Sequence, residues 1–215
     1  PLFTSYKVVT LDNYKMRFTM NASGDGTAQI LSQSGTNSDA NGILNWANIF
    51  KPFGEFRDDI SQLRLKQTND PGDTQGDIVG TIKINQSDPN LLDITMDTST
   101  FPTNTQTAVD AVVDPQANFP GDGTITAAVD GDRYLLTKDV AGGSGWLGSS
   151  AKKHDIIQYS VGTNQWDIVF DAVANGSTLQ YVTNTTTMDR LKYNGTAWVN
   201  AFEGTYNPGF WRIYL

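Results

Sequence analysis

The sequence predicts a mainly β protein with two small antiparallel domains, sandwich-like or barrel-like, and one short helix in the N-terminal half. Three observations lead to this prediction. Thr, Asn, Asp, Gly and Ser dominate the polar positions, whereas the helix-favouring residue Glu occurs only at Glu55 and Glu203. Short alternating apolar segments recur between turns that contain Gly and Pro. The 215 residues, of which 38% are hydrophobic and 18% charged, leave room for two folded cores.

The clearest strand of the N-terminal half covers residues 14–20. Its apolar residues Met16, Phe18 and Met20 alternate with polar ones, as in a strand with one buried face. Residues 27–31 form the expected partner strand. The turn residues between them, in the segment 21–26, include two glycines and favour a hairpin.

Residues 38–50 have helical rather than alternating spacing. The residues that recur at this spacing are Ile43, Trp46, Ile49 and Phe50. Ser38 or Asp39 is a candidate N-cap, and Pro52 ends the pattern. One short helix is therefore expected here. Trp46 and Phe50 are candidate residues of an interface or glycan site, although such spacing is more typical of a buried core.

Further strands are expected at residues 63–65, 78–84 and 91–96, between turns at 69–72 and 87–90. A segment rich in Pro and Gly follows at 114–123 and contains little core material. We place the domain boundary there. The expected domains are 1–120, a β-rich assembly domain with the short helix, and 121–215, a β domain with a repeated hairpin.

The C-terminal part contains a short internal repeat. Tyr159 and Trp166 in the first copy correspond to Tyr193 and Trp198 in the second, each pair separated by a polar turn. The two Tyr-to-Trp spacings differ by two residues, so the pleat keeps each Trp on the same face. Both copies therefore predict hairpins of one design.

Two more strands are expected around residues 179–182 and 209–215, and they would complete a small antiparallel sheet or barrel with the two hairpins. Free chain ends are usually frayed and polar, whereas this end is apolar and should be ordered. The tryptophans of this part are candidates for an interface or for stacking on sugars. They are Trp146, Trp166, Trp198 and Trp211.

The residue inventory argues against an enzyme and against a bound cofactor. Cys is absent and His154 is the single histidine, with no Gly-x-Ser-x-Gly motif for a nucleophile. The acidic segments 70–77 and 130–132 do not match a twelve-residue calcium loop, so no metal is predicted. Many carboxylate pairs are available for glycoside hydrolysis, but the sequence singles out none of them.

Charge and hydropathy restrict the partners. The net charge is −8, and the 15 basic residues are scattered, so nucleic acid is not expected to bind. No apolar run approaches the roughly 20 residues of a membrane span, and the residues from Pro1 to Thr4 do not begin a charged segment followed by an apolar stretch, the pattern of a signal peptide. The start at Pro1 is consistent with removal of an initiator methionine. We therefore expect synthesis in the cytoplasm and neither secretion nor membrane insertion.

A series of motifs follows from residue 131 onward. They are Gly131-Asp132-Arg133-Tyr134, Gly145-Trp146-Leu147-Gly148, residues 155–159, Trp166, Tyr181-Val182 and residues 191–198. In their order and spacing they resemble a domain family of unknown function found in tail and virion proteins of tailed phages and related gene-transfer particles. The resemblance covers somewhat under half the chain. It implies a β fold and a virion setting, and no catalytic residue is known for the family.

Gly131, Asp132, Arg133 and Tyr134 are expected to have structural roles. The glycine and aspartate would turn the chain into a strand, Arg133 would hold a carboxylate or carbonyl, and Tyr134 would enter the core.

The leading functional hypothesis is a structural component of a tailed-phage virion: a decoration, neck, baseplate or fibre-associated subunit. It would bind other virion proteins, form symmetric homo-oligomers and be located in the virion. The alternative is a carbohydrate-binding module of a receptor-binding tail protein that contacts a host-surface glycan. A depolymerase is the third hypothesis, disfavoured by the short chain and the few general bases.

Overall fold

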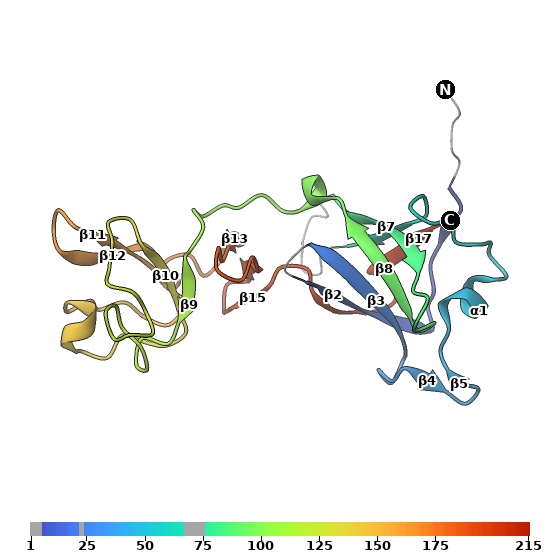
Figure 1. The fold of residues 1–215 in the computed structure, drawn as a ribbon, viewed down its shortest axis with the longest axis horizontal. Coiled ribbons are helices and arrows are strands. Elements are labelled where there is room, and N and C mark those ends of the chain that lie inside the picture. Colours follow the sequence, from blue (N-terminus) through green and yellow to red (C-terminus); the bar gives the residue numbers. More distant parts are fainter. Residues whose placement is uncertain (1–5, 22–23, 67–75) are drawn as a thin grey trace, which may run out of the picture. The chain divides into compact units, whose positions relative to one another are not determined.

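The chain is mainly β with one short α-helix among the residues described, as the sequence predicts. The structure is a computed structural model that describes residues 6–21, 24–66 and 76–215 (Figure 1). It divides into two compact units. Unit 1 comprises Pro1–Pro102 and Phe202–Leu215, and unit 2 comprises Thr103–Ala201. These limits differ from the expected division at residue 120, because residues 103–120 pack with unit 2 and the chain end returns to unit 1.

Unit 1 is built on an eight-stranded antiparallel sheet in the order β1-β17-β6-β7-β8-β3-β2-β16. Its strands are β1 (Val8–Val9), β2 (Tyr14–Met20), β3 (Asp25–Ser32), β6 (Gln62–Leu65), β7 (Ile78–Ile84), β8 (Leu91–Met96), β16 (Gly204–Tyr206) and β17 (Trp211–Tyr214). The edge strands β1 and β16 do not pair with each other, so the described strands do not close into a barrel.

The hairpin of β2 and β3 confirms the alternation in the sequence. Met16 and Phe18 are fully buried, whereas Arg17 and Thr19 point to the exposed face. Residues 22–23 of the connecting turn lie outside the described residues, as does the predicted turn at 69–72.

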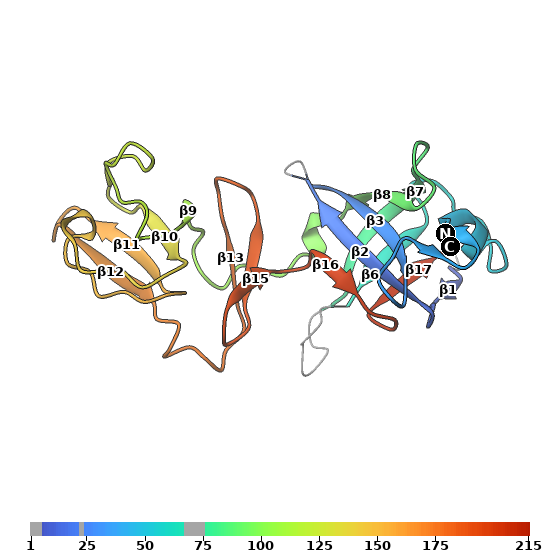
Figure 2. The same ribbon diagram turned by 90° about the horizontal axis from the view of Figure 1, so that it is seen from below.

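The C-terminal strand β17 belongs to unit 1, not to the C-terminal sheet in which we expected it. It pairs with β6 on one side and with β1 on the other, and β16 pairs with β2. In Figure 2 these red strands lie among the blue and cyan strands from the beginning of the chain. Trp211 and Ile213 are buried in the unit 1 core, which explains why the chain end is apolar and ordered.

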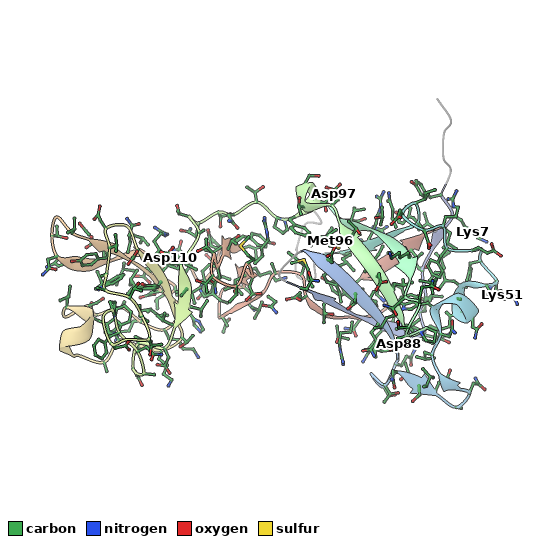
Figure 3. The ribbon with its side chains drawn as sticks, in the orientation of Figure 1. Lys7, Lys51, Asp88, Met96, Asp97 and Asp110 are labelled. Carbon is green, nitrogen blue, oxygen red and sulfur yellow. The ribbon has the colours of Figure 1, made fainter. Side chains whose placement is uncertain are left out.

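The helix of unit 1 is shorter than predicted. α1 covers Trp46–Phe50, and the Asn45 side chain caps it by accepting a hydrogen bond from the backbone N–H of Asn48 at 3.2 Å. The expected cap at Ser38 or Asp39 is wrong, because β4 (Ser38–Asp39) and β5 (Gly42–Ile43) form a small hairpin there. A single 3₁₀ turn, η1 (Thr98–Thr100), follows β8 and is capped by Asp97, labelled in Figure 3.

Unit 2 contains a four-stranded and a three-stranded sheet. The first has the order β12-β11-β10-β9, and the second has the order β13-β14-β15. Their bounds are β9 (Ala111–Val113), β10 (Arg133–Leu136), β11 (Ile156–Ser160), β12 (Gln165–Phe170), β13 (Gln180–Thr183), β14 (Arg190–Tyr193) and β15 (Trp198–Asn200), with the 3₁₀ turn η2 (Ser144–Trp146). Strands β9 and β10 are parallel, a departure from the expected antiparallel pattern.

The four-stranded sheet is covered by an apolar cluster on each face. One cluster includes Tyr134, Leu136, Ile157 and Trp166, together with Trp146 from η2. The other cluster joins Leu135, Ile156 and Phe170 to Val182 and Tyr193 of the three-stranded sheet. Adjacent residues such as Tyr134 and Leu135 point to opposite faces, which explains why β10 is apolar without alternation.

Both copies of the internal repeat are hairpins, as predicted. In the β11–β12 hairpin Tyr159 lies directly opposite Trp166, and in the β14–β15 hairpin Tyr193 lies directly opposite Trp198. The ring centroids are 5.2 Å apart in the first pair and 5.4 Å apart in the second.

Candidate interaction surfaces

The sequence-predicted tryptophans of the first hairpin region are core residues. Trp146 is 2% exposed and Trp166 is 6% exposed, and their ring centroids lie 5.3 Å apart. The indole N–H of Trp146 donates to the backbone carbonyls of Pro115 and Asn118. Since these rings are enclosed, neither offers a face on which a sugar could stack.

Trp198 is half-buried, and its contacts are also internal. Its indole N–H donates to the His154 carbonyl at 2.8 Å, and its ring packs against Phe170 and Tyr193 with centroids 5.4 Å away in each case. These contacts fix Trp198 within unit 2.

The aromatic candidates of unit 1 form one buried cluster. Trp46, Phe50 and Trp211 are all 1% exposed or less, and the ring centroids of Trp46 and Trp211 are 5.7 Å apart. The Trp46 indole donates to the Ala28 carbonyl at 3.0 Å. The core interpretation of the helical spacing therefore applies to Trp46 and Phe50.

Residues 131–134 form a turn and the beginning of β10. Gly131 has a φ of 90°, and the Asp132 carboxylate accepts the Val129 N–H, so both residues form the turn. The Arg133 guanidinium donates to the Gln158 amide oxygen at 2.6 Å. The backbone N–H of Arg133 donates to the carboxylate of Asp110, labelled beside β9 and β10 in Figure 3.

Burial also governs the titration of two groups in unit 2. Tyr134 enters the core, and desolvation there, assisted by the charges of Asp132 and Asp110, raises its pKa to about 12. Desolvation and the neighbouring Lys153 lower the pKa of His154, against the weaker opposite effect of Asp155. The Asp155 carboxylate accepts hydrogen bonds from the backbone N–H groups of Lys152 and Ala172, and it thereby links two loops.

Two carboxylates of the calcium candidates have partners far away in the sequence. The Asp130 carboxylate accepts the Val161 N–H, and the Asp77 carboxylate forms an ion pair with Arg212 at 2.8 Å. Asp70 and Asp73 lie outside the described residues. In the described part of the chain, no three His, Asp or Glu residues converge as metal ligands. No helix in that part is long and apolar enough to cross a membrane.

A polar cleft of about 530 Å³ lies on the exposed face of the unit 1 sheet, across β2, β3, β8 and β7. The hydroxyls of Thr19 and Thr27 are 2.8 Å apart on neighbouring strands. Its other polar lining includes Thr81, Thr95, Lys83 and the carboxylates Asp25, Asp59 and Asp93. These groups suit a hydroxyl-rich ligand, although no aromatic ring lines the cleft.

The outer edge of β12 is open. Tyr159 of β11 donates its backbone N–H to Asp132 and accepts at its carbonyl from Gly131, so both groups face β10. Backbone groups alternate in direction along an antiparallel strand, so the backbone N–H and C=O groups of Gln158 and Ser160 face β12. Their backbone partners there are Asp167 and Gln165.

The backbone N–H and C=O groups of Trp166 and Ile168 consequently point away from the sheet. No described strand pairs with them, because β12 is the last strand of its sheet.

A groove of about 330 Å³ runs beside this edge, between β12 and the loop of residues 147–150. Ile168 and Leu147 are 42% and 44% exposed, so apolar surface borders the groove. Leu147 has a φ of 52°, a left-handed conformation that costs a non-glycine residue about 1–2 kcal/mol. Sequence reasoning missed this surface, since the alternation of Trp166, Asp167 and Ile168 predicts a strand but not its place at the edge.

Comparisons of the chain with protein-family models, with curated proteins and with solved structures found no match.

Proposed function

We propose that the chain is a structural component of a tailed-phage particle that acts through contacts with other particle proteins. The observation that carries this proposal is the open β12 edge, beside a groove that the exposed side chains of Ile168 and Leu147 border. Unpaired strand edges bind other chains readily, and proteins usually cover, shorten or charge them unless they are used for contact. The resemblance of residues 131–215 to phage virion proteins supports the setting.

The architecture suits a contact role. Most tryptophans are buried in the cores, so each unit is held by its own packing, while apolar side chains such as Ile168 and Leu147 remain exposed beside the β12 edge. Symmetric copies in a particle and a location in the virion are parts of the same proposal.

The test is the composition of purified particles. Particles of the source phage would be banded on a density gradient, washed at high salt and quantified by mass spectrometry. The chain is expected at a constant ratio to the other particle proteins in every fraction. Its loss on washing, or its presence only in the soluble lysate, would contradict the proposal.

A second candidate function is glycan binding, favoured by the polar cleft of unit 1 and not by the buried tryptophans. Binding of oligosaccharides to the isolated chain would be measured by calorimetry, with Thr81→Val as the test variant. Thr81 lines the cleft and lies opposite Thr95 and Gln62 on the exposed face of the sheet. Glycan binding that Thr81→Val leaves unchanged would contradict binding in the cleft.

A further inference from the structure

The β12 edge can accept one added strand in a defined register. The outward backbone groups of Trp166 and Ile168 would bond to that strand, as in β-augmentation. Asp167 lies between them, so one residue of the added strand would stand directly opposite its carboxylate. Side chains directly opposite one another lie with their Cβ atoms about 4.5–5.5 Å apart.

The two faces of the added strand would contact different kinds of side chain. Ile168 lies opposite Ile157, on the face where the cluster around Trp146 is buried, and the exposed Leu147 borders the same groove. Added residues on this face would therefore be apolar.

Asp167 points to the other face, where it continues a row of polar residues. Its neighbour in the row is Gln158, which accepts from Arg133. Asp167 is exposed and forms no ion pair with any residue that the structure describes. A Lys or Arg opposite it would supply the missing positive charge.

A second copy of the chain does not satisfy these demands. The two-fold antiparallel register that uses the outward groups of both Trp166 and Ile168 is centred on residue 167. It would place Asp167 opposite its own copy, and like charges directly opposite one another destabilise a strand pair. The net charge of −8 adds repulsion between copies.

We infer that the β12 edge binds an extended segment of another protein in which apolar residues alternate with Lys or Arg. This inference rests on the proposed function, because it names the partner chemistry of the contact surface. The segment pairs with Trp166 and Ile168, covers Ile168 and Leu147 with its apolar residues, and places a cation opposite Asp167.

The test uses two short synthetic peptides, one in which valine alternates with lysine and one in which valine alternates with glutamate. Binding to the full chain would be followed by fluorescence polarisation of the labelled peptides and by amide shifts in NMR spectra. The lysine peptide is expected to bind and to shift the amides of Trp166 and Ile168. The glutamate peptide is expected to bind more weakly by about tenfold or more.

Two variants locate the site. Asp167→Lys should reverse the preference between the two peptides, while Asp58→Lys, the same charge change at an exposed unit 1 residue, should leave it unchanged. Ile168→Pro removes an outward N–H that β11 does not use, so it should abolish binding of both peptides while the chain stays folded.

Each outcome decides the inference. Failure of the lysine peptide to bind, or equal binding by the wild type and Asp167→Lys, would overturn it. Self-association that Ile168→Pro abolishes would show that the occupant is a second copy and would also overturn it. The particle composition experiment reads out separately, so the chain can be a particle protein even if this edge takes no basic strand.

Discussion

The two Tyr–Trp hairpins of unit 2 have the same local geometry but different surroundings. The interplanar angles are 45° for Tyr159 and Trp166 and 43° for Tyr193 and Trp198, with nearly equal centroid distances. Trp166 is buried, and its ring centroid lies 5.3 Å from the centroids of both Tyr134 and Trp146, whereas Trp198 is only half-buried. The cross-strand pair is thus a property of the hairpin sequence, and the burial of each Trp depends on the elements that pack against it.

The largest expected difference between the hairpins is in the cost of losing the indole. Trp166→Ala should lower the free energy of unfolding by about 4 kcal/mol, because a fully packed aromatic leaves a large cavity. Trp198→Ala should cost about half as much, since part of its ring already faces solvent. Urea unfolding followed by circular dichroism measures both values.

Equal losses for the two variants would contradict the difference in burial. Phe210→Ala, an exposed aromatic of unit 1, is the control and should change stability by less than about 1 kcal/mol.

The turns of the two hairpins provide the next contrast. Gly195 has a φ of 90°, and an added Cβ would lie 2.3 Å from the Gly176 carbonyl oxygen. Gly195→Ala should therefore destabilise the chain by about 1–3 kcal/mol. At Gly162 in the first turn an added Cβ would meet only the Ser160 hydroxyl at 3.9 Å, an ordinary contact, and the φ is not left-handed, so Gly162→Ala should be neutral or slightly stabilising.

Thermal unfolding of both glycine variants tests this contrast. A Gly162→Ala variant that loses as much stability as Gly195→Ala would show that turn propensity, and not the close approach to Gly176, sets the cost.

These contrasts separate what the sequence predicts from what only the fold determines. Alternation and the Tyr-to-Trp spacing predicted the β2–β3 hairpin and both repeats, because strand pairing there is local. The return of Trp211 to β6 and the parallel pairing of β9 with β10 could not be predicted, since they join residues far apart in the chain.

The aromatic candidates show the same limit. From the sequence alone, Trp146 and Trp166 could each be a core residue or a contact residue. Their burial shows that they are core residues, but burial is known only once the neighbouring elements are placed. The sequence does not indicate Asp167 and Ile168 as contact residues. They are candidates because β12 is the last strand of its sheet, and this follows only from the fold.

The smallest expected difference concerns the two tyrosine hydroxyls. Tyr193 donates to the buried Ala172 carbonyl at 3.0 Å, so Tyr193→Phe leaves that acceptor without a partner and should cost about 1–2 kcal/mol. Tyr159 donates to the part-buried Asn164 side chain at 2.8 Å, where water can replace the hydroxyl, and Tyr159→Phe should cost about 0.5 kcal/mol. Chemical denaturation of both variants beside the wild type gives the two values. A greater loss for Tyr159→Phe would mean that the hydrogen bond to Asn164 within the first hairpin contributes more to stability than the bond from Tyr193 to the buried Ala172 carbonyl.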